Sequence, residues 1–455
     1  MCAIATTAEH AAARPESQRF TRDEIAALKK RDNLTNFGYI AGIYAVIIIT
    51  AVAAIGVFEA YRAGEIGLGW AILAGFLAVL SMGASQHQFG AVIHEATHYV
   101  LFENRKLNEL ASDWLAGFPI YTSTQSYRLH HFAHHQFVND PDRDPIATQA
   151  SESGHWLDFP VTHIELAKGF LKLLLPTNLV RYLVTRARHS SMPDETNPYF
   201  DEETRPNVLA VRIAVIYLIG LPLALVALVA TGQFFAAAML LVGSYVLAMA
   251  YYLAIPEHYF MTPNIKPVIS DRYTTIGRLT YATMLYGLVT VAEYATGAPA
   301  WGYLFLLWFL PLFTAFPVFM VLREWIQHGN ADRGRYTNSR VFLVDPLSRY
   351  AVFPLGMDYH LPHHLYASVP HYRLKALHKL LQRDPAYVEK CRIVRGWTGN
   401  VENMPGIVEV LGPRYAVHSD EITIDEKALE NAEIRNPTAI AAQVEASRKG
   451  RIWRR

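Results

Sequence analysis

Six long apolar stretches divide the chain, and each approaches the roughly 20 residues that a helix needs to cross a lipid bilayer. Five carry few or no charged residues: 37–61, 67–85, 208–230, 234–255 and 298–322. The sixth, 277–297, is weaker because it contains Arg278 and Glu293. The pattern predicts an all-α integral membrane protein with about six transmembrane helices.

The polar links between these stretches predict how the helices are oriented. The short links 62–66, 231–233 and 297–300 hold almost no positive charge, whereas the remaining segments hold nearly all the lysines and arginines. The positive-inside rule then places the short links outside and everything else in the cytoplasm, as three hairpins. The alternative is a four-span core in which 277–297 or another run lies in the membrane interface. We expect the cell's inner (plasma) membrane as the location.

The polar segments suggest a simple domain organisation. Residues 1–36 are expected to be a cytoplasmic segment without a secretory signal, because they lack an apolar core. Residues 37–382 would form the membrane domain, and 383–455 a polar cytoplasmic tail. Segment 164–184 mixes Lys168, Lys172 and Arg181 with leucines and is interrupted by Pro176, which is typical of an amphipathic helix lying in the interface.

Composition narrows the function classes. The chain is 52% hydrophobic and 18% charged, with a formal net charge of +1, so its charge gives no argument for nucleic-acid binding. Its two cysteines, Cys2 and Cys391, form neither a disulfide framework nor a metal-binding spacing.

Histidines gather in three short motifs and at one further position. HEATH places His94 and His98 four residues apart, so both share one helical face after the second apolar stretch. HFAHH gives His131, His134 and His135, and HLPHH gives His360, His363 and His364, each a set expected to converge on one face. His328 follows the last apolar stretch. The predicted topology brings all of them to the cytoplasmic side.

These nine imidazoles are too many for one ion, since a single zinc takes about four ligands. They suit two metal ions, and the donor type alone allows iron, copper, zinc or nickel. HEATH also matches the zinc-protease pattern HExxH, but a protease leaves the two HxxHH motifs unexplained. A metal transporter would be expected to place its ligands inside the spans.

One histidine of the second motif differs from its neighbours. In YRLHHFAHHQF, His131 meets both His134 and His135 at helical spacing, whereas His130 meets only His134. His130 is therefore expected to lie beside the ligands rather than to be one.

The motifs together resemble those of the membrane-bound fatty acid desaturase and hydroxylase superfamily, the histidine-box di-iron proteins. HEATHYVLFENRKLNELASDWLAGFP (94–119), HHFAHHQFVNDPDRDP (130–145) and MDYHLPHHLYASVPHYRLKALHKLL (357–381) are similar to its three boxes. REWIQHGNADRGRYTNS (323–339) resembles the segment that supplies one more histidine. The resemblance covers roughly residues 37–382. Two departures are Asp358, where members often have Asn, and Glu324, where some have an Asn that reaches a metal through water.

The resemblance implies a di-iron, O2-dependent oxidoreductase acting on unactivated C–H bonds of a lipid or fatty acyl chain. A fatty acid desaturase is the first expectation, and a hydroxylase or monooxygenase of an alkyl or other hydrophobic compound is the alternative. It implies two irons held by the nine histidines, O2 as co-substrate, and a separate ferredoxin- or cytochrome-type electron donor. Candidates for orienting the ligands are Glu95, His130, Asp144, His258, Glu324 and Asp358.

Overall fold

The computed structural model describes residues 20–191, 197–200, 207–261, 263–398, 404–417 and 421–449. Regular structure in these residues is almost entirely helical, with one parallel pair of strands, β1 (Arg340–Leu343) and β2 (Arg392–Arg395). The predicted all-α class is confirmed.

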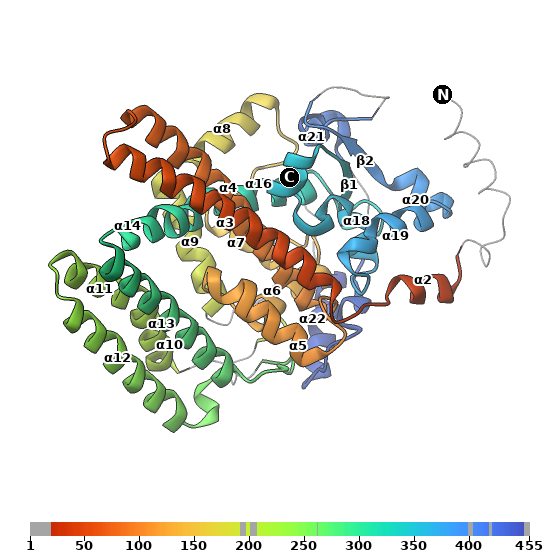
Figure 1. The fold of residues 1–455 in the computed structure, drawn as a ribbon. Coiled ribbons are helices and arrows are strands. Elements are labelled where there is room, and N and C mark those ends of the chain that lie inside the picture. The colour runs from red at the N-terminus through yellow and green to blue at the C-terminus, as the bar shows by residue number, and fades with distance from the viewer. Residues whose placement is uncertain are drawn as a thin grey trace.

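The apolar stretches form the long helices on one side of the molecule (Figure 1). Within the described residues, five helices are long and apolar enough to cross a membrane: Thr35–Arg62, Leu68–Thr97, Val208–Ala230, Phe234–Ala254 and Ala300–His328. They correspond to α3 (Thr35–Arg62), α4 (Leu68–Thr97), α10 (Val208–Val215) with η5 (Ile216–Gly220) and α11 (Leu221–Ala230), α12 (Phe234–Ala254), and the run α14 (Ala300–Leu304), η7 (Phe305–Phe309), α15 (Leu310–Phe313) and α16 (Ala315–His328). Their hairpin turns lie on the left of Figure 1, and the two strands with α19 and α20 lie on the right.

The sixth stretch folds as α13 (Asp271–Thr296), which packs against α12 and α14. One face exposes Met284, Leu288, Val291 and Tyr294, as expected of a surface in contact with lipid. Its polar residues face neighbouring helices instead: the hydroxyls of Thr283 and Tyr217 lie 2.6 Å apart. Such interhelical hydrogen bonds satisfy polar groups within a membrane. That α13 crosses the bilayer stays a prediction.

Close contact between α4 and α16 brings two distant parts of the site together. A Cβ added to Gly83 on α4 would stand 2.5 Å from the Cβ of Ala315, so only glycine allows this approach. Because α4 leads into the first histidine motif and α16 ends at His328, the contact fixes their relative position.

The predicted interfacial segment forms two helices broken at the proline, α8 (His163–Leu173) and α9 (Pro176–Ser191). They expose Ile164, Leu171, Val180 and Val184 beside the charged Lys168. This mixture fits helices that lie along a membrane surface.

The remaining elements form a cap over the ends of the long helices (Figure 1). They are α2 (Arg22–Leu28), α5 (Arg105–Ser112), η2 (Asp113–Gly117), η3 (Phe118–Ile120), α6 (Thr124–Gln136), α7 (Pro145–Glu152), η6 (Glu257–Tyr259), α17 (Pro346–Ala351), η8 (Pro354–Tyr359), α18 (His360–Leu365), η9 (His371–Arg373), α19 (Leu374–Leu381), α20 (Pro385–Lys390), α21 (Ile407–Val410), η10 (Pro413–Tyr415), η11 (Glu426–Leu429) and α22 (Pro437–Lys449).

The polar C-terminal segment packs against this cap in its described parts. β2 pairs in parallel with β1, and Ile434 forms an isolated bridge with Ile265, in the link between α12 and α13. The hydroxyl of Ser447 on α22 donates to Asp140, 2.6 Å away, in the loop that follows the second histidine motif. The segment therefore covers the part of the cap that holds the histidines.

Candidate metal centre

Four helices bring the histidine motifs to one place. α4 continues past its apolar stretch, so His94 lies on its last turn and His98 is its C-cap residue. α6, capped by Ser123, carries the second motif, and α16 ends at His328. α18 carries the third and begins after a sharp turn at Gly356 (φ 78°), where a Cβ would meet the His371 carbonyl oxygen at 2.9 Å.

All nine predicted histidines fall into two buried clusters. The five-histidine cluster comprises His94, His98, His131, His135 and His363. The four-histidine cluster comprises His134, His328, His360 and His364. Within each cluster, one nitrogen from every ring lies within 4.8 Å of the others.

The structure corrects the expectation that each HxxHH motif presents one convergent set. His131 and His135, four residues apart, join the five-histidine cluster, while His134 joins the other. The third motif divides in the opposite sense, with His360 and His364 in the four-histidine cluster and His363 in the five-histidine cluster. Adjacent residues on a helix point about 100° apart. Each adjacent pair of histidines therefore serves both clusters.

The distances between ring nitrogens fit metal coordination. Two nitrogens bound at right angles, each about 2.1 Å from one ion, lie about 3.0 Å apart. The Nε2 atoms of His98 and His131 are 2.9 Å apart, and those of His135 and His363 are 3.0 Å apart. In the other cluster, His360 Nε2 lies 2.9 Å from His328 Nε2 and 3.1 Å from His364 Nε2.

Metal ligation requires neutral imidazole rings, and burial disfavours the charged form of most of these histidines. Burial, assisted by the nearby His134 and Arg323, lowers the pKa of His363 to about 3. Burial, assisted by neighbouring imidazoles, holds the pKa values of His98, His131, His135, His360 and His364 well below the usual 6.5. Neither ring nitrogen of His94 has a hydrogen-bond partner, although the ring is buried. Buried polar atoms are normally paired, so a bound ion would account for this nitrogen set.

Two rings of the four-histidine cluster are oriented by oxygen atoms that contact their Nδ1 atoms. His134 Nδ1 lies 2.9 and 3.0 Å from the carboxylate oxygens of Asp144, which also caps α7. His328 Nδ1 faces the carbonyl oxygen of Asn338 at 3.3 Å. Such contacts leave Nε2 free to bind a metal and raise the basicity of the ligand.

Replacing Asp144 with Asn should weaken metal binding at the four-histidine cluster by about 10- to 100-fold, the usual cost of losing such a partner. Asn caps helices about as well as Asp, so α7 should persist. Metal retained against graded chelator concentrations measures the effect. Asp142→Asn, an exposed change in the same loop, is the control. Equal retention by both variants would contradict the role of Asp144.

The other predicted orienting residues lie in different places. Glu95 is buried, with Oε1 3.4 Å from His94 Nδ1, and accepts a hydrogen bond from the His371 amide at 2.8 Å. Asp358 pairs with Arg349 at 2.8 Å, and burial raises the pKa of its carboxyl. Glu324 forms an ion pair with the neighbouring Arg323.

His130 and His258 belong to neither cluster. The His130 ring lines a large cavity and lies 5.9 Å from the Phe200 ring. His258 is exposed on η6, where its ring packs against Tyr259. Because His258 is exposed and belongs to neither cluster, we do not expect it to orient a ligand.

Sequence reasoning missed Arg128, which is buried and holds the end of α4. Its guanidinium donates to the carbonyl oxygens of Thr97 at 3.0 Å and Ala96 at 2.9 Å, and forms an ion pair with Glu109. Arg128 is the only lysine or arginine between Lys106 and Arg143, and this isolation is the signal that could have found it.

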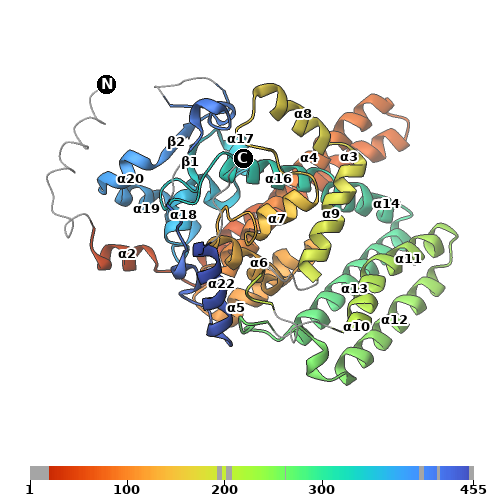
Figure 2. The same ribbon diagram turned by 180° about the vertical axis from the view of Figure 1, so that it is seen from behind.

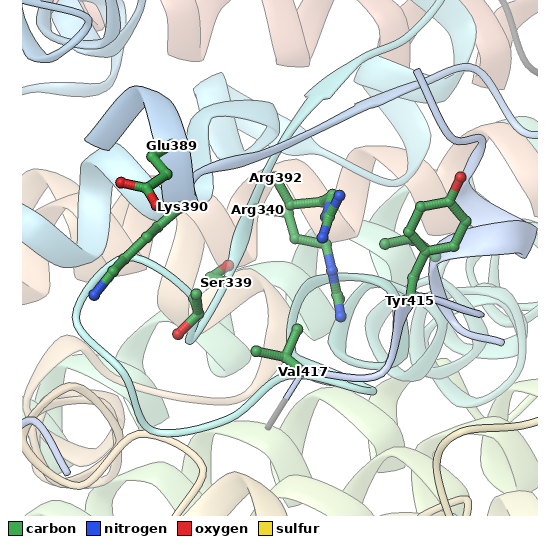
Figure 3. Close-up of a pocket in the computed structure, with 9 residues that line it drawn as sticks. Ser339, Arg340, Glu389, Lys390, Arg392, Tyr415 and Val417 are labelled. Atoms are coloured by element: carbon green, nitrogen blue, oxygen red, sulfur yellow. The ribbon is translucent and has the colours of Figure 1, made fainter. Parts of the chain in front are cut away.

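A second buried arginine holds the end of α16. Arg340 donates to the carbonyl oxygens of Ile326 at 2.9 Å, Gly329 at 2.6 Å and Asn330 at 2.8 Å. It lines a small cavity of about 180 Å³, where its side chain lies beside that of Arg392 on the paired strand (Figure 3). Because these donors are used within the protein, we interpret Arg340 as a support for the helix end that carries His328.

Long apolar helices and two adjacent clusters of buried imidazoles define the class: a membrane protein with a candidate site for two metal ions. A family model described as fatty acid desaturase matches residues 68–277 and 265–393. The chain therefore belongs to the fatty acid desaturase family, which confirms the family predicted from the histidine motifs.

Two curated relatives agree with this family. The chain is 30% identical over 136 residues to the dihydrorhizobitoxine desaturase of Bradyrhizobium elkanii, a match covering 29% of this chain and 35% of that protein. It is 36% identical over 82 residues to the Delta(5) fatty acid desaturase fat-4 of Caenorhabditis elegans, covering 17% of this chain and 18% of that protein. The matches thus span about a third of the first relative and less than a fifth of the second.

Proposed function

We propose that the protein is an O2-dependent, di-iron desaturase of a lipid or fatty acyl chain. The observation that carries this proposal is the pair of histidine clusters at the polar end of a long apolar cavity, in a chain of the desaturase family. Both relatives are named as desaturases, which favours removal of two hydrogens over insertion of oxygen.

The nine histidines would hold two iron ions, which supply the oxidising chemistry that C–H bonds require. Asp144 and the Asn338 carbonyl orient His134 and His328, and burial keeps water away from both clusters. Arg128 and Arg340 fix the helix ends that present His98 and His328. The role of these side chains is thus to position the metal-binding histidines and the substrate.

The substrate chain would lie in a cavity of about 680 Å³ that His131 lines. Its walls beyond the histidines are apolar, among them Leu218, Phe305 and Leu312. A cavity of this size and character suits a single hydrophobic ligand.

We further propose that the centre faces the cytoplasm of a cell with this protein in its plasma membrane, because the positively charged segments lie on the cap side. The two electrons that O2 activation needs would come from a separate ferredoxin- or cytochrome-type donor. The described residues contain one cysteine, Cys391, and thus no cysteine-ligated cluster.

Lipid analysis tests the reaction. Mass spectrometry of host lipids with and without the gene should show a product that has lost two hydrogens, and only when O2 is present. A product that gains one oxygen would contradict desaturation and indicate the hydroxylase alternative. A zinc metalloprotease, for which Glu95 would be the base, finds no support, since that carboxylate is buried and engaged by the His371 amide.

A further inference from the structure

The large cavity differs in character between its two ends. It lies between α9 and α16 on one side and α10, α11 and α13 on the other, helices that run near one another in Figure 2. Near the histidines its walls include Ser126, Tyr127, Gln149 and Arg186. Toward the hairpin turns they are formed by apolar side chains only: Ile219, Pro222, Leu223, Val226, Trp301, Phe305 and Phe309. The cavity therefore suits an amphiphile whose polar group lies near the histidines.

The charges that line the cavity do not balance. The lining contains three arginines, Arg186, Arg278 and Arg323, but only two carboxylates, Asp271 and Glu324. Glu324 pairs with Arg323, and Asp271 lies within electrostatic range of Arg278 on the same helix. Arg186 is left with one long contact, to the Tyr182 hydroxyl at 3.5 Å. No carboxylate in the described part of the chain pairs with it.

Arg186 lies at the histidine end of the cavity. Arg186 and Tyr127 both line this cavity, and α9, which carries Arg186, packs against α6, which carries Tyr127. The Tyr127 ring in turn stacks on His131, with ring centres 5.2 Å apart. A partly buried guanidinium without an anionic partner is costly, and its planar set of donors matches a carboxylate or phosphate.

We propose that Arg186 binds the anionic head group of the substrate, a carboxylate or phosphate carried by an alkyl chain. The chain then extends along the apolar walls toward Phe305 and Trp301. Because α9 exposes apolar side chains along its outer face, an amphiphile can reach Arg186 from the membrane surface. This inference rests on the proposed function only in calling the ligand a substrate, since binding itself requires neither metal nor turnover.

Equilibrium binding to the purified full-length protein in detergent tests the proposal. Three probes share a sixteen-carbon chain: palmitate, palmitoyl lysophosphatidylglycerol and neutral hexadecanol. They are measured on the wild type, on Arg186→Gln and on Arg186→Lys. Arg188→Gln is the matched control, since Arg188 lies on the same helix, is exposed and pairs with Glu152.

The wild type should bind palmitate or the lysophospholipid at least about tenfold more tightly than hexadecanol, as a charge-assisted contact predicts. Which anionic probe binds more tightly identifies the carboxylate or the phosphate as the head group. Arg186→Gln should abolish that preference while hexadecanol binding stays unchanged, which also shows that the variant is folded. Arg186→Lys should keep part of the preference, and Arg188→Gln all of it.

A wild type that does not distinguish the anionic probes from hexadecanol would overturn the proposal. So would an Arg186→Gln variant that keeps the preference. A protein that shows the preference but no oxidation of lipids would support the head-group site and refute the desaturase function instead.

Discussion

His363→Ala should remove one of two bound metal ions and lower the oxidation rate by more than a hundredfold. Loss of a residue that merely orients a ligand costs about 10- to 100-fold, so loss of a ligand should cost more. His363 is buried, with Nε2 3.0 Å from His135 Nε2. Metal content and product formation by the purified protein measure both effects.

The neighbouring residue makes this prediction specific. His364→Ala should also leave one ion. Because His364 belongs to the four-histidine cluster, the ion that remains should be the one in the five-histidine cluster. The two variants should therefore differ spectroscopically while sharing the loss of activity. His258→Ala, an exposed change, should keep both ions and full activity. Retained activity in His363→Ala would show that the ligand assignment is wrong.

Arg128→Leu should destabilise the protein by about 3–5 kcal/mol, because it leaves a buried carboxylate without its partner. The carboxylate is Glu109, and the carbonyl oxygens of Ala96 and Thr97 would lose their donor as well. Those carbonyls end the helix that carries His94, so metal binding should weaken together with stability. Thermal or chemical unfolding in detergent, followed by tryptophan fluorescence, gives the change in free energy of unfolding.

A double substitution separates charge from packing. Replacing Arg128 and Glu109 together with leucine should recover much of the loss, since neither buried charge then remains unpaired. Arg105→Leu, an exposed change, should cost less than about 1 kcal/mol. A double variant as unstable as Arg128→Leu would mean that the carbonyl contacts, rather than the ion pair, stabilise this region.

The sequence predicted which histidines come together better than how they divide between the two clusters. Histidine spacing identified eight of the nine clustered rings, because i, i+4 pairs such as His94 and His98 stay together on a helix, and the ninth, His328, was identified by its position after the last apolar stretch. It could not assign His134 and His363 to their clusters, since this depends on how α6 and α18 approach each other. The supporting contacts of Arg128 and Arg340 also depend on tertiary packing.

For the membrane helices, too, the sequence did not predict the contacts that depend on tertiary packing. Apolar length alone predicted five of them, but α13 has polar residues that only its neighbours explain, such as Thr283 facing Tyr217. The C-terminal segment was expected to be a polar tail, and its polar residues are used in contacts with the cap, as Ser447 is with Asp140. Composition does not reveal such pairing.

The central claim is that the two histidine clusters hold two irons. Metal analysis of the purified full-length wild type, by inductively coupled plasma mass spectrometry with protein quantified by amino-acid analysis, tests it most directly. About two irons per chain, with one in His363→Ala, is the predicted result. A single zinc per chain in the active protein would contradict it.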